Sequence, residues 1–292
     1  SDLFLQMLGL LVLFPFHGLC HLPQHPSQTS ASLIHTFESE PIAPVSLSEL
    51  PPLPTGARLD VETRGLVGGS SVGLGGKLWP SAAALARWLR SHRALVEGAH
   101  VVELGCGTGA VGLYAAALGA ASVTLTDGGD ERLLRVAMAN LEANRAHIDP
   151  TGCHVRILRH EWGTGQLSAS LPARVHLLVG SDVTYARQTH AQLCTSIRSV
   201  LDECGQPRVV LAHEHRRIRL VAGGGVADRA DRGAWDEGLE HFHEEAARAR
   251  LQVSTLGLEH QAKHGLRDIA LLEVTSGDTV AAPDGNAICD ES

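Results

Sequence analysis

Apolar residues recur along this chain with two alternating spacings, one helical and one typical of short strands. Residues 81–94 place Leu85, Trp88 and Leu89 at helical spacing, and residues 100–104 form a short β-type run. The same pattern predicts further helices over 109–118, 131–145, 188–203 and 235–250. It predicts further strands over 122–126, 154–158, 175–180, 208–212, 251–257 and 268–274.

Repeated strand–helix units predict a parallel sheet with helices on both faces. The last two strands follow one another with no helix between them, so we expect them to form an antiparallel pair at one edge. The sequence therefore predicts an α/β fold with a Rossmann-like, seven-stranded sheet that is mostly parallel and has an antiparallel edge strand.

The N-terminal part of the chain departs from this pattern. Residues 3–16 are almost continuously apolar, and residues 27–55 are rich in serine and proline. The apolar run is too short for a typical membrane span. No lysine or arginine precedes Arg58, so the basic segment that a signal peptide has before its apolar run is missing. We expect residues 1–57 to be a poorly ordered extension, with a targeting segment as the open alternative. Residues 58–275 are then the folded domain, and 276–292 a disordered tail.

Composition narrows the class of partner and the compartment. The 292 residues carry a formal net charge of −8 and contain no basic run, so we expect no direct nucleic-acid binding. The six cysteines are scattered without a C-x-x-C pair, which excludes a zinc knuckle and favours a reducing compartment. We expect a cytoplasmic monomer without a stable membrane span, while the apolar N-terminal segment leaves targeting to another compartment open.

A glycine-rich loop, Gly105-Cys-Gly-Thr-Gly109, follows the predicted strand 100–104. Ligands of open α/β sheets bind beyond the carboxyl ends of the strands, and glycines let the backbone approach a ligand closely. We therefore assign Gly105, Gly107 and Gly109 to a nucleotide-like cofactor. The loop also satisfies the dinucleotide pattern G-x-G-x-x-A, which by itself is a weak signal.

Two carboxylates at strand ends indicate which cofactor this is. Glu103 would repel a pyrophosphate, but it suits the ammonium of the methionine part of S-adenosylmethionine. Asp127 follows the strand 122–126 and can accept both ribose hydroxyls of either NAD or S-adenosylmethionine. Because Glu103 discriminates between the two cofactors, we predict S-adenosyl-L-methionine.

Four motifs, in their order and spacing, resemble the family-16 (methyltransferase-like 21) group of seven-strand methyltransferases, most of whose characterised members methylate protein lysines. The resemblance covers residues 69–274. Its markers are the segments 75–82 (GGKLWPSA), 103–109 (ELGCGTG), 161–163 (EWG) and 181–185 (SDVTY). One departure is His160-Glu161, where the family usually has an apolar residue and an aspartate.

The resemblance implies roles for five further residues. Trp79 and Trp162 would flank the cofactor, Ser181 would contact it through its backbone, and Asp182 and Tyr185 would form the substrate side. Methyl transfer from a sulfonium is an in-line displacement that needs alignment and a deprotonated amine. Asp182 can orient a lysine ammonium, and Tyr185 can pack on it by a cation–π contact. This chemistry requires no metal.

The tripeptide His213-Glu214-His215 follows the predicted strand 208–212 at the same carboxyl edge. Successive strand residues point to opposite faces, so Glu214 opposes the two histidines, which is poor geometry for three metal ligands. We therefore predict no metal site, and we expect Glu214 to help frame the acceptor pocket. The histidines and glutamates of the helix 235–250 are expected on a solvated face.

The sequence is thus interpreted as a S-adenosylmethionine-dependent methyltransferase that acts on a lysine side chain of a protein substrate. One alternative is a methyltransferase for a small molecule, or for histidine or arginine side chains, with the same cofactor site. The other is a catalytically silent cofactor-binding scaffold. Specificity is expected in residues 216–234 and in the segment before Arg58, which carry no readable chemical motif.

Overall fold

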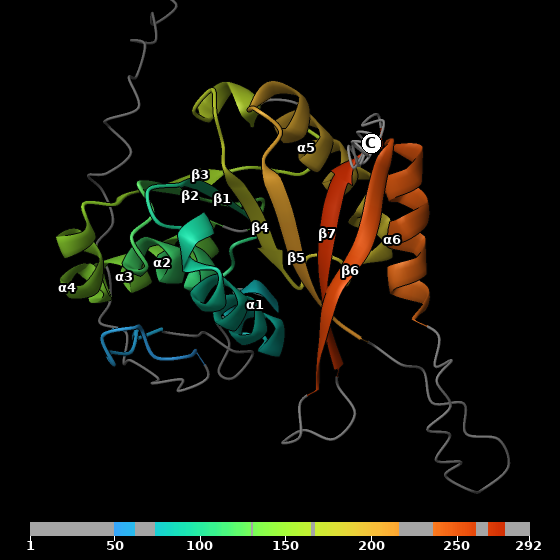
Figure 1. Cartoon of the computed structure of the whole chain (residues 1–292). Coiled ribbons are helices and arrows are strands. Elements are labelled where there is room, and N and C mark those ends of the chain that lie inside the picture. The colour runs from blue at the N-terminus through green and yellow to red at the C-terminus, as the bar shows by residue number, and fades with distance from the viewer. Residues whose placement is uncertain are drawn as a thin grey trace, which may run out of the picture. The chain divides into compact units, whose positions relative to one another are not determined.

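The computed structural model describes residues 50–61, 74–129, 131–164, 167–215, 236–260 and 268–277. Seven strands form one sheet in the order β3-β2-β1-β4-β5-β7-β6 (Figure 1). Their bounds are β1 His100–Leu104, β2 Ser122–Asp127, β3 His154–Arg159, β4 Leu177–Ser181, β5 Arg208–Glu214, β6 Leu251–His260 and β7 Asp268–Ser276. The predicted α/β fold with a mostly parallel, seven-stranded sheet is confirmed.

The strand directions place the expected antiparallel pair at one edge of the sheet. β1 pairs in parallel with both β2 and β4. The chain therefore adds β2 and β3 on one side of β1 and then returns to add β4 and β5 on the other side. β7 runs antiparallel to β5 and to β6, so the reversed strand is β7 and not the edge strand β6 itself. Burial agrees with this order: most residues of β7 are buried, whereas β6 is exposed or half-buried from Gln252 to Glu259.

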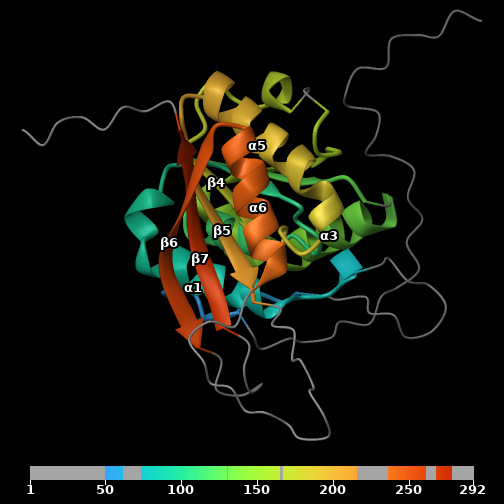
Figure 2. The same cartoon turned by 90° about the vertical axis from the view of Figure 1, so that its right-hand side faces the viewer.

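Helices cover both faces of the sheet (Figure 2). They are α1 Pro80–Ser91, α2 Ala110–Ala117, α3 Glu131–Ala143, α4 Arg145–Ile148, α5 His190–Glu203 and α6 Glu237–Arg248. One-turn 3-10 helices lie at Leu74–Gly76, Arg93–Leu95, Asp149–Thr151, Ser168–Ser170 and Arg187–Thr189. Val101 belongs to a buried core cluster that includes residues of α1, α2 and α3, while its neighbour Val102 belongs to a second cluster that includes residues of α5 and α6. Two buried faces explain why the central strands are continuous apolar runs.

Two helices have other bounds than predicted, because side chains form hydrogen bonds with the backbone at their termini. The helix predicted over 131–145 is interrupted at Asn144, whose side-chain amide donates to the carbonyl oxygens of Asp60 and Asn140 at 2.6 and 2.7 Å. The helix predicted over 235–250 begins only after Asp236, which caps α6 by accepting from the backbone N–H groups of Gly238 and Leu239. Residue 235 lies outside the described residues.

The packed part of the chain begins before the predicted boundary at Arg58. Leu50 and Leu53 are buried in the core, and the hydroxyl of Tyr114 in α2 donates to the Pro52 carbonyl at 3.1 Å. Leucines between the prolines supply apolar contacts that the serine and proline content alone does not indicate. Residues 1–49 of the predicted extension, which was expected over 1–57, and residues 278–292 of the predicted tail lie outside the described residues. Within the described part, no helix is both long and apolar enough to cross a membrane.

Candidate functional site

A cavity of about 660 Å³ opens where β1, β2 and β4 end. This is the edge at which open α/β sheets bind ligands, and the volume is in the range of small-molecule sites, roughly 300–1,000 Å³. Nine of the ten residues that the sequence assigns to the site line this one cavity. They are Trp79, Glu103, Gly105, Gly107, Asp127, Trp162, Ser181, Asp182 and Tyr185.

The glycine loop turns in the left-handed region at the floor of this cavity. Gly105 and Gly107 have φ values of +61° and +52°. A Cβ atom on Gly107 would lie 2.6 Å from the backbone oxygen of Gly75, so the loop passes too close to the chain for a side chain. Gly109 also has a positive φ, but it does not line the cavity; a Cβ there would crowd Leu125 at 3.1 Å. Its place is at the start of α2, and a role in contacting the ligand stays a prediction.

Asp127 at the end of β2 is held by the loops around it. Its Oδ2 accepts from the backbone N–H of Gly107 at 2.9 Å, and its Oδ1 accepts from that of Gly129 at 2.8 Å. A carboxylate offers about four lone-pair positions, so each oxygen can accept one more hydrogen bond. The carboxylate is therefore oriented by the protein and still able to accept from a pair of hydroxyls in the cavity.

The side chain of Glu103 is almost completely buried, with 1% of the residue's surface exposed. Its Oε2 accepts from the backbone N–H of Gly112 at 2.8 Å. Burial raises the pKa of Glu103 to about 8, against the opposing effect of that hydrogen bond. A positive charge in the cavity would favour the ionised form and lower this pKa. A cationic group in the cavity would therefore be matched by the carboxylate of Glu103.

The two tryptophans differ in their hydrogen bonding. The indole N–H of Trp79 donates to the Leu74 carbonyl at 3.1 Å, and the ammonium of Lys77 lies 4.6 Å from the centre of its ring. The indole N–H of Trp162 is buried and has no hydrogen-bond partner within the described part of the chain. A buried, unpaired donor is costly, and Trp162 lines the cavity, so this N–H is suited to an acceptor atom of a ligand.

The substrate-side motif lies at the wall and the mouth of the cavity. Asp182 directly follows β4, is 5% exposed and has a φ of +54°, a conformation uncommon outside glycine. Its backbone N–H donates to the Ala212 carbonyl at 2.7 Å, which ties the turn to β5. Tyr185 is 48% exposed. The motif thus combines a buried acid with an accessible aromatic ring, and the unusual backbone at Asp182 is typical of functional sites.

The sequence analysis missed the groups that hold this motif in place. The Thr184 hydroxyl lies 2.6 Å from Nδ1 of His213 in β5, and the Thr184 carbonyl lies 3.0 Å from Nε2 of His190 in α5. All three residues are buried. His213 is distant from Thr184 along the chain, and His190, although only six residues away, lies on a different element, so no local pattern indicates these contacts. Thr189 and Gln192 also line the cavity without having been predicted.

The departure at His160-Glu161 has a structural explanation. His160 is buried, and its Nε2 lies 3.0 Å from the hydroxyl of Ser196 in α5, which also accepts from the backbone N–H of Gly163. Burial lowers the pKa of His160, which favours its neutral form. Glu214, by contrast, is buried but is not among the residues that line the cavity, so its expected role in framing the acceptor pocket finds no support here.

Comparisons with known proteins agree with this geometry. A model of the family described as lysine methyltransferase matches residues 66–220. The chain is 32% identical to mouse EEF1A lysine methyltransferase 3 over 47% of its length, and 33% identical to mouse protein N-lysine methyltransferase METTL21A over 48%. It is 31% identical to an Arabidopsis thaliana calmodulin-lysine N-methyltransferase over 42%. These matches span 54%, 60% and 40% of the three relatives, about half of their length.

Proposed function

Because the chain belongs to the lysine methyltransferase family, which matches residues 66–220, we propose that it transfers a methyl group from S-adenosylmethionine to a lysine side chain of a protein. One observation carries this proposal. A single cavity joins an acid suited to a cation, Glu103, and a backbone-held carboxylate, Asp127, to the buried Asp182 and the exposed Tyr185. The cavity therefore offers one region for a cofactor and one for an acceptor.

The described residues fit S-adenosylmethionine. Gly105 and Gly107 line the cavity where its methionine part would lie, Glu103 matches its ammonium, and Asp127 can accept from its ribose hydroxyls. The indole N–H of Trp162, which has no hydrogen-bond partner among the described residues, can donate to a ring nitrogen of its adenine. When bound, this cofactor supplies an electrophilic methyl group on a positively charged sulfur. The protein's contribution is to bind, align and exclude water.

The acceptor side is assigned to Asp182 and Tyr185. Asp182 would hold the incoming lysine ammonium at the cavity wall, and Tyr185 would pack its ring on the aliphatic stem or the cation. Lysine has a pKa of about 10.4 in water, so the amine must lose a proton before it attacks. Asp182 or a water molecule beside it can take up that proton. The products are the methylated lysine, the neutral thioether and one released proton.

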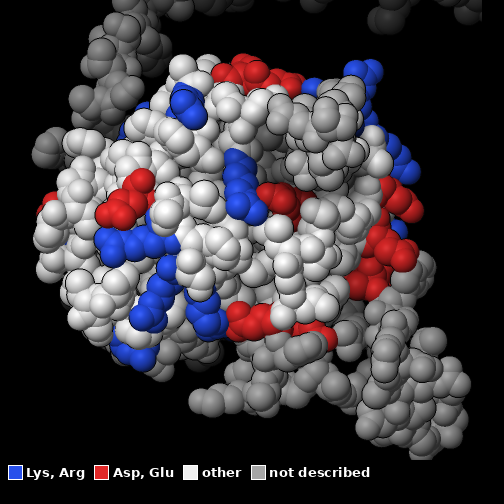
Figure 3. Space-filling model, in the orientation of Figure 1, with Lys and Arg blue, Asp and Glu red and all other residues white. Residues whose placement is uncertain are grey.

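A protein substrate, bound by a cytoplasmic monomer, completes the proposal. On the face shown in Figure 3, basic side chains form separate groups, the largest of them at the lower left, and acidic side chains lie beside these groups. That arrangement offers no continuous basic track for a nucleic-acid backbone over the described part of this face. The exposed ring of Tyr185 is an accessible anchor for a side chain presented by another protein.

The test of this proposal is methyl transfer in a cell lysate. The purified full chain is incubated with lysate and S-adenosylmethionine labelled in the methyl group, and the products are separated by gel electrophoresis. We expect label on a discrete protein band, recovered as methyllysine after acid hydrolysis. Label only in small molecules, or on histidine or arginine, would support a different acceptor. Cofactor binding by calorimetry without any transfer would instead support a scaffold.

Glu103→Gln is expected to flatten the pH dependence of cofactor affinity. Between about pH 6 and pH 7.5 the cofactor's amino group stays largely protonated, while the pKa of Glu103 in the free protein is about 8. Rising pH therefore ionises Glu103, and wild-type affinity should rise. The glutamine keeps an acceptor for the Gly112 N–H but no charge, so its affinity should be lower and nearly constant. Calorimetric titrations with S-adenosylmethionine across this window measure both curves.

The same pKa shift has the opposite effect on stability. The pKa of Glu103 is raised on folding from 4.5 to about 8, so its favourable contribution is complete below pH 4.5 and is lost as the pH rises through 8. Urea unfolding should show Glu103→Gln gaining stability relative to wild type as the pH rises. Parallel affinity curves for the two proteins, or a constant stability difference, would contradict the assignment of Glu103.

A further inference from the structure

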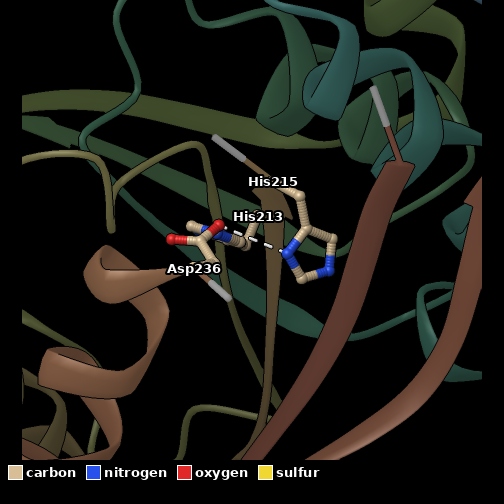
Figure 4. A group of neighbouring side chains, drawn as sticks. All are labelled: His213, His215 and Asp236. Atoms are coloured by element: carbon tan, nitrogen blue, oxygen red, sulfur yellow. Dashed lines mark hydrogen bonds and ion pairs between the residues drawn. The ribbon is translucent and has the colours of Figure 1, made fainter. Parts of the chain in front are cut away.

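Three side chains converge outside the cavity, at the carboxyl end of β5 and the first turn of α6 (Figure 4). His213 and His215 lie two residues apart on β5 and just beyond it, and Asp236 is the residue that caps α6. Nε2 of His213 is 2.8 Å from Oδ2 of Asp236, and Nδ1 of His215 is 3.2 Å from the same oxygen. His213 and Asp236 are buried, and His215 is 16% exposed.

We propose that His213, His215 and Asp236 form a binding site for a divalent transition-metal ion of the zinc class. Two imidazole nitrogens and one carboxylate oxygen are donors that zinc prefers, and three protein ligands leave one position for water. Atoms bound to one ion in tetrahedral geometry at about 2.0–2.1 Å lie about 3.3 Å apart. The distances of 2.8 and 3.2 Å, with all three atoms within 4.8 Å, approach that arrangement.

Surrounding groups orient two of the three ligands toward this point. Nδ1 of His213 lies 2.6 Å from the Thr184 hydroxyl, which can accept from that nitrogen and leave Nε2 unprotonated for the metal. Oδ1 of Asp236 accepts from the N–H groups of Gly238 and Leu239 at 3.0 and 3.1 Å, which leaves Oδ2 turned toward the histidines. Hydrogen bonds of this kind to the far side of a ligand are usual in metal sites.

The position at the start of α6 makes the carboxylate indispensable. The N-terminus of a helix carries a partial positive charge that disfavours a cation. A metal bound by His213 and His215 alone would meet that charge, whereas the negative charge of Asp236 offsets it. Asp236→Asn is therefore an informative variant, because asparagine is also a good N-cap and keeps the helix start while removing the charge.

An ion at this point would join three parts of the fold. Its ligands come from the end of β5, the residue just after it and the N-cap of α6, and Thr184 connects His213 to the turn that carries Asp182 and Tyr185. None of the three ligands lines the cavity, so the site is separate from the one that we assign to methyl transfer. The sequence analysis predicted no metal site because it considered Glu214 as the third ligand beside the two histidines. In the structure the carboxylate that lies beside them is that of Asp236.

The experiment is a metal titration of the untagged full chain after removal of metals with a chelator. Zn²⁺ binding is measured by calorimetry against a competing chelator, and Co²⁺ binding by visible absorption, whose intensity reports tetrahedral geometry. We expect one equivalent of each ion at this site, and a loss of affinity of at least about 100-fold in both His215→Ala and Asp236→Asn. Zn²⁺ should raise the melting temperature of the wild type but of neither variant.

The control is His100→Ala, which removes one of two neighbouring histidines elsewhere, since the His100 and His176 rings lie 5.3 Å apart. This variant should bind Zn²⁺ like the wild type, because His100 is not one of the proposed ligands. The control is needed because any of the 17 histidines in the chain can contribute weak, unspecific binding. Circular dichroism of each metal-free variant establishes that it is folded. If folded wild type binds no equivalent more tightly than His215→Ala, the three side chains are a metal-free hydrogen-bonded cluster and the proposal is wrong.

Discussion

Replacing Asp182 by asparagine is expected to lower the rate of methyl transfer by at least about 100-fold, the range of a positioned acid or base, and to leave cofactor affinity nearly unchanged. Asp182 is buried at the cavity wall, where a charge acts on a bound ammonium with little screening by water. Asparagine has almost the same shape but no charge. An acceptor amine would then lose the group that orients it and helps it to lose a proton.

Asparagine is the informative substitution because of the backbone at this position. Asp182 has a φ of +54°, and asparagine adopts this left-handed conformation more readily than most residues. Alanine would add backbone strain to the loss of charge, and the two effects could not be separated. Asp149→Asn is the matched control, since Asp149 is exposed on the surface and does not line the cavity.

Transfer is measured with labelled S-adenosylmethionine in the lysate assay, and affinity is measured by calorimetry. Asp149→Asn should transfer at the wild-type rate. Normal transfer by Asp182→Asn would remove Asp182 from the reaction. A parallel loss of cofactor affinity would place its role on the cofactor side instead.

A second large effect is expected for Gly107→Ala, which should weaken cofactor binding by at least about 30-fold. Any L residue in the left-handed region costs about 1–2 kcal/mol. At Gly107 the new methyl group would also lie 2.6 Å from the Gly75 carbonyl oxygen, and backbone atoms cannot swing aside as a flexible side chain can. The loop or the segment at Gly75 must move, and a displacement of 1 Å in a binding site can cost about 100-fold in activity.

Gly152→Ala isolates the contribution of backbone strain. Gly152 has a φ of +73°, close to that of Gly107, but a Cβ atom there meets nothing within 4 Å. Urea unfolding should show a modest destabilisation in Gly152→Ala and a larger one in Gly107→Ala, and calorimetry with S-adenosylmethionine should show weakened binding only in Gly107→Ala. Equal cofactor affinities in the two variants would mean that the close approach of Gly75 does not shape the site.

The parts of the fold that sequence predicts well are those determined by nearby residues. Strand β1 and the glycine loop after it are contiguous, so one short window contains both the apolar run and the turn. The carboxylates Glu103 and Asp127 occur at strand ends, and parallel strands bring such ends together at one edge. Local pattern and sheet geometry were therefore enough to identify Glu103, Gly105, Gly107 and Asp127 in the cavity wall, whereas the other predicted lining residues came from the resemblance to the family.

The missed features depend on contacts between distant segments. Asp236 is separated from His213 by a segment without readable motif, so the approach of their side chains has no counterpart in the sequence pattern. Asn144 interrupts a regular helical pattern through its bonds to Asp60, far away in the chain. Periodicity records which face of an element is buried, but not which polar partner from elsewhere meets it.

The packing of Leu50 and Leu53 also determines where this chain can be shortened. A fragment that starts at Arg58, the boundary suggested by composition, would lose both leucines and uncover the apolar surface beneath them. It would also leave the Tyr114 hydroxyl without the Pro52 carbonyl, within a helix that is otherwise buried. Exposed apolar surface promotes aggregation, so a soluble fragment for binding studies has to retain the proline-rich segment 50–57.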